Sequence, residues 1–188
     1  MVDVLIKEVS NKLNSHFKLK GFTPLYKCTV GDVSLHDKNN EGGTEEEILD
    51  SVILSLVSIE EENVLKNNYP SRQVGANLIM EKSAVYINAY LLFSAKYATY
   101  DTGLKAISQV ISCFQTARRL PISSGAEEQE AVLNLHNLGF ENLNNLWTVL
   151  GGRYLPSVIY KARLLMYQQS PPRNGSMITD IREQESLQ

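Results

Sequence analysis

Residues 141–163 read ENLNNLWTVLGGRYLPSVIYKAR, and this stretch decides the fold. Its first half places apolar residues three and four positions apart, which predicts one face of a helix: Leu143, Leu146, Trp147 and Leu150. The pair Gly151-Gly152 follows, and glycine is the residue that most often ends a helix. After Pro156, apolar and other residues alternate over residues 157–167, which predicts a strand.

Trp147, the single tryptophan of the chain, has two possible roles. It is expected to lie in the core, where a buried tryptophan contributes several kcal/mol to stability. The alternative is an exposed anchor at a protein interface, where Trp, Tyr and Arg are enriched.

Further elements follow on both sides of this stretch. Apolar residues spaced at three and four predict a helix over residues 2–17, with Gly21 at its stop. Residues 51–59 carry no charge and are rich in β-branched side chains, which is typical of a central strand that is apolar on both faces. Residues 84–93 predict a second strong strand, and residues 28–35 a weak one. Residues 37–44 and 67–70 are expected to form a loop and a turn.

A second helix is predicted after Asp101, which can cap it. Its sheet-facing side is expected to hold apolar residues at helical spacing: Leu104, Ile107, Val110, Ile111 and Phe114. Residues 121–125 are expected to be a loop because they contain Pro121 and Gly125. Residues 130–138 alternate and favour a strand, although a helix over 127–138 also fits. The fold class is therefore α/β (α+β): two layers, with a mixed or antiparallel sheet packed against helices.

Composition limits the domain count and the function. The chain has 188 residues, enough for one domain, which we expect over residues 1–170. Pro171-Pro172 should end it, and the polar residues 171–188 should form a flexible arm. The net charge of −3 argues against a nucleic-acid-binding protein. The longest apolar run, residues 89–93, is too short to cross a membrane. Cys28 and Cys113 are expected to be buried thiols in a protein made in a reducing compartment.

The sequence offers little catalytic chemistry. His16, His36 and His136 lack metal-ligand spacing, and no nucleophile motif or phosphate-binding loop is present. Gly151-Gly152-Arg153 follows a helix, and the negative end of a helix dipole repels anions. We expect no catalytic residue, metal or cofactor. The run Glu60-Glu61-Glu62 is expected to be a solvated strand end, or alternatively a surface for a basic partner.

Four separated blocks resemble the cap, or tail-terminator, proteins of contractile injection systems, the phage-tail-like particles of the antifeeding-prophage and virulence-cassette type. The blocks are residues 51–67, residues 85–95 (VYINAYLLFSA), residues 100–115 (YDTGLKAISQVISCFQ) and residues 143–163. They occur in the family's order and extend over most of residues 1–167. Residues 1–50 and those after Gln168 match less well.

The resemblance implies a structural protein, not an enzyme. It implies that Trp147 and Leu146 lock their helix to the sheet. The candidates for contact with a neighbour are then the polar residues around the turn: Asn144, Asn145, Arg153 and Tyr154. The resemblance also implies a homo-hexameric ring at the tail end distal to the baseplate, in contact with sheath or inner-tube proteins, which ends polymerisation and fixes particle length. It further implies assembly in the cytoplasm before the particle is released. The polar arm, with its patch Met177-Ile178-Thr179, could engage the sheath by adding a strand, against the alternative of plain disorder. The alternative functions are a monomeric assembly adaptor or chaperone, and an enzyme with an unrecognised site.

Overall fold

A computed structural model describes residues 1–22, 25–33, 50–62, 71–74, 77–80, 85–124, 127–151, 154–166 and 173–176 of the chain. The chain divides into two compact units. Unit 1 comprises Met1–Glu60 and Ile87–Leu165, and unit 2 comprises Glu61–Tyr86 and Met166–Gln188.

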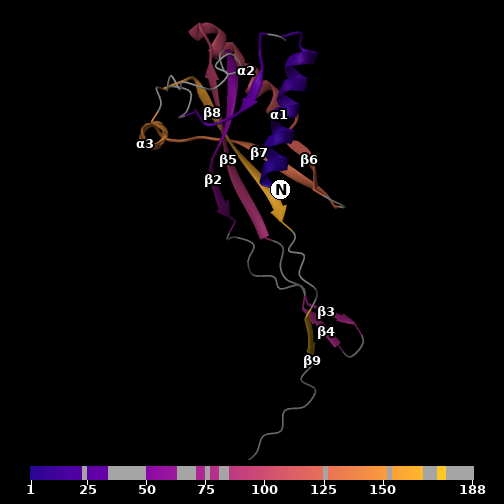
Figure 1. Cartoon of the computed structure of the whole chain (residues 1–188). Helices are drawn as coiled ribbons and strands as arrows, with labels where there is room; N and C mark the ends of the chain where they lie inside the picture. Colours follow the sequence, from indigo (N-terminus) through magenta and orange to yellow (C-terminus); the bar gives the residue numbers. More distant parts are fainter. Residues whose placement is uncertain are drawn as a thin grey trace, which may run out of the picture. The chain divides into compact units, whose positions relative to one another are not determined.

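Unit 1 is built on a six-stranded sheet with the strand order β1-β2-β5-β8-β7-β6 (Figure 1). The strands are β1 (Cys28–Val30), β2 (Ser51–Glu61), β5 (Val85–Lys96), β6 (Arg119–Ser124), β7 (Glu127–His136) and β8 (Ser157–Met166). β1 pairs with β2 in parallel, whereas β7 pairs antiparallel with both β6 and β8. The mixed sheet and the α+β class predicted from the sequence are confirmed.

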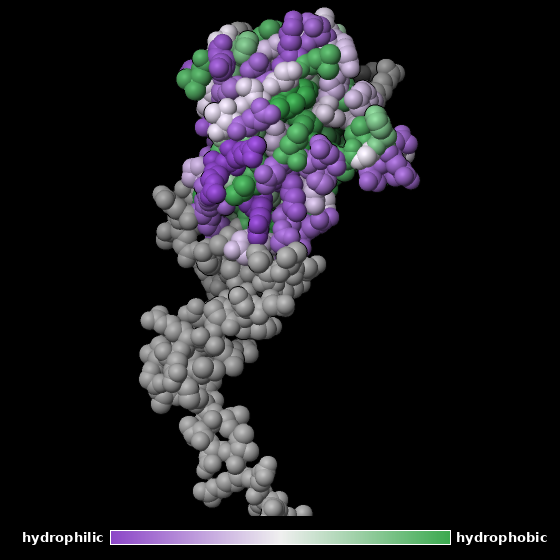
Figure 2. All heavy atoms as spheres, turned by 180° about the vertical axis from the view of Figure 1, so that it is seen from behind, coloured by the Kyte–Doolittle hydropathy of each residue, from purple (hydrophilic) through white to green (hydrophobic). Residues whose placement is uncertain are grey.

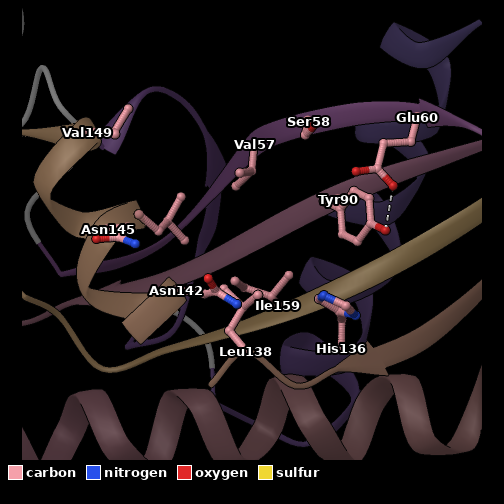
Figure 3. Close-up of a pocket in the computed structure, with 11 residues that line it drawn as sticks. Val57, Ser58, Glu60, Tyr90, His136, Leu138, Asn142, Asn145, Val149 and Ile159 are labelled. Carbon is pink, nitrogen blue, oxygen red and sulfur yellow. Dashed lines mark hydrogen bonds between the residues drawn. The ribbon is translucent and has the colours of Figure 1, made fainter. Parts of the chain in front are cut away.

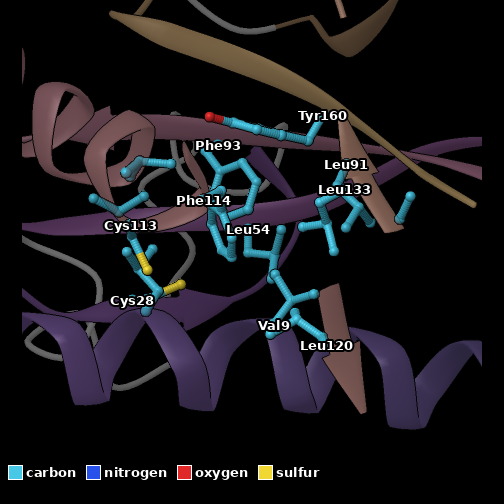
Figure 4. Packing of buried hydrophobic residues seen from close by; sticks show 14 of the residues in the cluster. Val9, Cys28, Leu54, Leu91, Phe93, Cys113, Phe114, Leu120, Leu133 and Tyr160 are labelled. Atoms are coloured by element: carbon cyan, nitrogen blue, oxygen red, sulfur yellow. The ribbon is translucent and has the colours of Figure 1, made fainter. Parts of the chain in front are cut away.

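Two helices cover one face of this sheet. They are α1 (Val2–Leu19) and α2 (Tyr100–Thr116), and both contribute buried residues to the larger apolar core. Three rings form its centre: Phe93 of β5, Phe114 of α2 and Tyr160 of β8, with centroids 5.3 to 5.7 Å apart (Figure 4). Aromatic pairs at this separation stabilise a core beyond the area that they bury. The rings therefore fix α2 against the two central strands.

A third helix, α3 (Phe140–Leu150), packs on the opposite face. Val52 and Leu54 lie in the core under α1, while Ile53 between them lies in a second core with Trp147. Successive strand residues point to opposite faces, so the two cores lie on the two sides of β2. Helices thus cover both faces, and this explains why residues 51–55 are buried without interruption.

The predicted details of α2 were wrong in two respects. Its N-cap is Thr99, whereas Asp101 lies in the first turn and pairs with Lys105. Its buried face is Gly103, Ala106, Val110, Cys113 and Phe114. Leu104, which was expected in this face, is 44% exposed. Small residues let the helix lie close to the sheet. A Cβ on Gly103 would already be in van der Waals contact with Ala95 Cβ, at 3.7 Å.

The loop predicted at residues 121–125 is also wrong, because β6 includes Pro121. Proline cannot donate a hydrogen bond to a neighbouring strand and is therefore confined to sheet edges. β6 is the last strand of the sheet and pairs only with β7, so it tolerates Pro121 opposite Glu130. The strand predicted over residues 130–138 is confirmed by β7, and the helical alternative is excluded.

Unit 2 contains a small antiparallel sheet that was not predicted. Its order is β3 (Ser71–Val74), β4 (Asn77–Met80) and β9 (Arg173–Ser176). β9 falls within residues 171–188, where we expected a flexible arm. The division into a domain over 1–170 and an arm stays a prediction. The expected loop 37–44, the turn 67–70, Pro171-Pro172 and residues 177–188 lie outside the described residues.

Candidate functional site

A groove in unit 1 lies beside α3. Helix α3 is short, so it covers part of its sheet face and leaves the groove along its flank. The groove has a volume of about 370 Å³ and a largely apolar lining. Its walls come from β2, β5, β7, β8, α3 and the segment between β7 and α3. The lining residues are Val57, Ser58, Glu60, Tyr90, His136, Leu138, Asn142, Asn145, Leu146, Val149 and Ile159 (Figure 3).

One end of the groove is polar. The Tyr90 hydroxyl donates a hydrogen bond of 2.9 Å to Glu60 Oε2. The His136 ring meets the Tyr90 ring edge to face, with centroids 5.0 Å apart. These contacts hold the three side chains in place around one end, while Val149 and Asn145 of α3 border the other (Figure 3). The arrangement suits an apolar side chain that carries a polar or positively charged neighbour.

The far side of α3 is held to the turn that follows it. Gly151 caps the helix in the left-handed conformation, with φ of 65°, as its sequence predicted. Trp147 is buried at 6% exposure, and its ring contacts that of Tyr154 with centroids 5.7 Å apart. Within the described part of the chain, its indole N–H has no hydrogen-bond partner. Leu146 is half-buried and packs against the same core.

The contact residues expected from the sequence do not form one cluster. Glu60 and Asn145 both line the groove. Asn144 is exposed on α3, and its carbonyl accepts a hydrogen bond from Thr148 Oγ1. Tyr154 is 61% exposed beside Trp147. Glu61 and Glu62 belong to unit 2, and Arg153 lies outside the described residues. A contact role for these residues stays a prediction.

Sequence reasoning did not select most of the lining residues, among them Tyr90, His136, Asn142 and Val149. The alternation along β5 placed Tyr90 on one face of the sheet. However, nothing in the sequence indicated which helix would lie beside it. Val149 is apolar and yet 84% exposed. This exposure cannot be seen in the sequence, because it depends on how α3 packs against the sheet.

The remaining candidates for chemistry are accounted for by local structure. Burial raises the pKa of Cys28 to about 12 and that of Cys113 to about 11, as expected for inert thiols. His16 Nε2 lies 3.3 Å from Gln109 Oε1 across the α1–α2 contact. His36 lies outside the described residues. Among the residues that the structure describes, no group of His, Cys, Asp and Glu could hold a metal ion, and no helix could span a membrane.

Comparison with models of protein families identifies the family of this chain. The model of the Pvc16 N-terminal domain matches residues 4–180. The chain belongs to this family. The match to the Pvc16 N-terminal domain extends over residues of both compact units. No curated protein matches the sequence.

Two solved structures share the fold. One is the sheath/tube terminator of PVC, an extracellular contractile injection system, in its extended state. It has a TM-score of 0.55 and 16% identity over 96% of this chain and 64% of that chain. The other is the tube-terminating cap of the anti-feeding prophage. It has a TM-score of 0.57 and 15% identity over 98% of this chain and 61% of that chain. This Pvc16 N-terminal domain therefore spans less than two thirds of either terminator.

Proposed function

We propose that this chain is a structural part of a cap that terminates the tail of a contractile, phage-tail-like injection particle. The observation that carries the proposal is the fold match to two terminators, which extends over 96% and 98% of the chain. The family assignment supports it independently, since the matching domain is that of Pvc16. This function needs no catalytic site, and we propose that the chain acts sterically.

The proposed partners are other copies of the chain and the sheath or inner-tube proteins. A six-membered ring would present one surface to the last ring of the tube or sheath. Its other surface would offer no site for a further ring, so polymerisation would stop there. Head-to-tail contacts between unlike surfaces can close into such rings. The protein would assemble in the cytoplasm and remain in the particle after release.

Electron microscopy of particles that contain an epitope-tagged copy tests this function. Antibody label at one end of every intact particle, with the protein retained after purification, is the expected result. A monomeric adaptor or chaperone would act during assembly and be lost on purification. Particles that lack the tagged protein while keeping normal ends would therefore contradict a cap and favour the adaptor.

A further inference from the structure

The C-terminal end of α1 carries an apolar side chain that projects into solvent. Leu19 is 86% exposed, and Lys18 and Lys20 on either side of it are exposed as well. We call these three residues the α1 knob. On the face drawn in Figure 2, hydrophobic side chains of this unit lie in separate areas among hydrophilic ones. A single exposed leucine is common on protein surfaces, so the knob indicates a contact only together with a surface that is complementary to it.

The helix end holds the knob in a fixed position. Gly21 adopts the left-handed conformation, with φ of 72°. The Phe22 amide donates to the Phe17 carbonyl at 2.9 Å, and the Gly21 amide donates to the Lys18 carbonyl at 3.1 Å. This pair of bonds is the Schellman motif, which satisfies the last carbonyls of a helix. Phe17 itself is fully buried, so the backbone of the knob is anchored to the core.

The groove beside α3 has the complementary chemistry. Its apolar walls, which include Val57, Leu146 and Ile159, could receive a leucine side chain. Of the lining residues, Glu60 is the single acid and none is lysine or arginine. The groove volume of about 370 Å³ falls in the range of ligand-binding pockets. Lysine side chains can lay their aliphatic stems on apolar surface while the ammonium group stays hydrated.

We propose that the α1 knob of one copy inserts into the groove of a second copy. Leu19 would fill the apolar part of the groove, against Val57 and Val149. Lys18 or Lys20 would reach the Glu60 carboxylate, one oxygen of which already accepts the Tyr90 hydrogen bond. This inference rests on the proposed function, because it names the contact by which copies of the cap chain would associate.

The positions of the knob and the groove in the fold determine how such contacts repeat from copy to copy. The knob belongs to the helix that covers one face of the sheet, and the groove lies beside the helix on the other face. A copy therefore cannot insert its knob into its own groove. Each copy offers one knob and one groove, so the contact is heterologous and repeats from copy to copy. Such a series closes into a ring when the rotation between copies allows it.

Two single variants and their mixture test the contact. Leu19→Gln removes the apolar knob and leaves the groove intact. Val149→Lys places a long charged side chain at the groove rim, where Leu19 of the incoming knob would pack, and leaves the knob intact. Both positions are exposed, so folding should be preserved, and circular dichroism checks this. Phe140→Gln is the matched control, since Phe140 is 93% exposed on α3 but does not line the groove.

Sedimentation velocity on the full chain gives the readout. Wild type and Phe140→Gln are expected to form oligomers at high concentration, and each groove or knob variant is expected to be monomeric. An equimolar mixture of Leu19→Gln and Val149→Lys should form dimers and nothing larger, because one intact knob meets one intact groove. A monomeric mixture, variants that assemble like wild type, or a wild type that stays monomeric would overturn the contact.

These outcomes are separable from the failure of the cap function. If the variants assemble normally and tagged protein still marks tail ends, the contact is wrong and the cap function stands. If tail ends lack the protein, the cap function fails, whatever the variants do in solution.

Discussion

The carboxamide of Asn14 pairs with both backbone groups of Cys28. The Cys28 amide donates to Asn14 Oδ1 at 2.8 Å, and Asn14 Nδ2 donates to the Cys28 carbonyl at 3.0 Å. Cys28 lies in β1, the strand at one edge of the sheet. A side chain of α1 thus takes the place of a further strand at this position. It ties the helix to the sheet and blocks the edge against pairing with another chain.

The first prediction concerns this pairing. Asn14→Ala leaves two partly buried backbone groups without these partners, and we expect the free energy of unfolding to fall by about 1–3 kcal/mol. Asn14→Asp keeps an acceptor for the Cys28 amide but places a carboxylate beside the Cys28 carbonyl. It should therefore not restore wild-type stability. Urea denaturation measures both, with Ser108→Ala on the exposed side of α2 as the control, expected within about 0.5 kcal/mol of wild type.

Trp147 gives the second prediction. Its truncation in Trp147→Ala should lower the free energy of unfolding by about 3–5 kcal/mol, because the side chain fills the core under α3. Tyr154→Ala removes an exposed ring and should cost about 1 kcal/mol. Thermal or chemical denaturation compares the two. Equal losses would mean that Trp147 is not the anchor of α3.

The third prediction concerns the two thiols. Because burial raises the pKa of Cys28 from 9.0 to about 12 and that of Cys113 to about 11, both should stay protonated at pH 8. Alkylation by iodoacetamide should then be slow in the native protein and fast in urea. The exposed thiol of a Leu19→Cys variant is the control and should react quickly without denaturant. Rapid reaction of the native thiols would contradict the packing shown in Figure 4.

The same shifts predict a dependence of stability on pH. A raised pKa means that the folded protein holds protons that the unfolded chain loses above pH 9. The contribution of the thiols is therefore complete below pH 9 and is lost as the pH rises towards about 12. Melting temperatures of wild type and Cys28→Ala should converge over this interval. A constant difference between them would argue against the shift.

The fifth prediction tests the charge in the groove. Glu60→Lys should weaken self-association several-fold, since the ammonium group would face Lys18 and Lys20 of the incoming knob. Combining it with Lys18→Glu and Lys20→Glu should recover part of the loss. Self-association of wild type should also weaken with added salt. Recovery is the informative outcome, because a merely structural effect of Glu60→Lys would persist in the combined variant.

The regular parts of unit 1 could be predicted from its sequence because local pattern and packing agree there. The apolar periodicity of α1 and α3 and the alternation of β7 and β8 each match the observed element. The exceptions have physical causes. β6 contains a proline that an edge strand tolerates, and α2 buries Gly103 and Ala106 rather than Leu104, because close approach to the sheet favours small residues. Neither circumstance is visible in a local pattern.

The groove and the small sheet were beyond sequence reasoning for another reason. β9 pairs with β4 although more than ninety residues separate the two strands in the sequence. The strands of the small sheet also lack an apolar alternation long enough to detect. The groove likewise draws its walls from several strands and a helix. Glu60 and Asn145 were selected for their polarity alone. That they line one groove follows from the packing of α3, which no single segment encodes.

The length of the tail tests the central claim most directly. Particles assembled without this protein should be compared in electron micrographs with particles from cells in which the protein is restored. A cap that stops polymerisation predicts that its loss gives tails of variable or excessive length, and that restoration returns a single length. A narrow, unchanged length distribution in its absence would contradict the account.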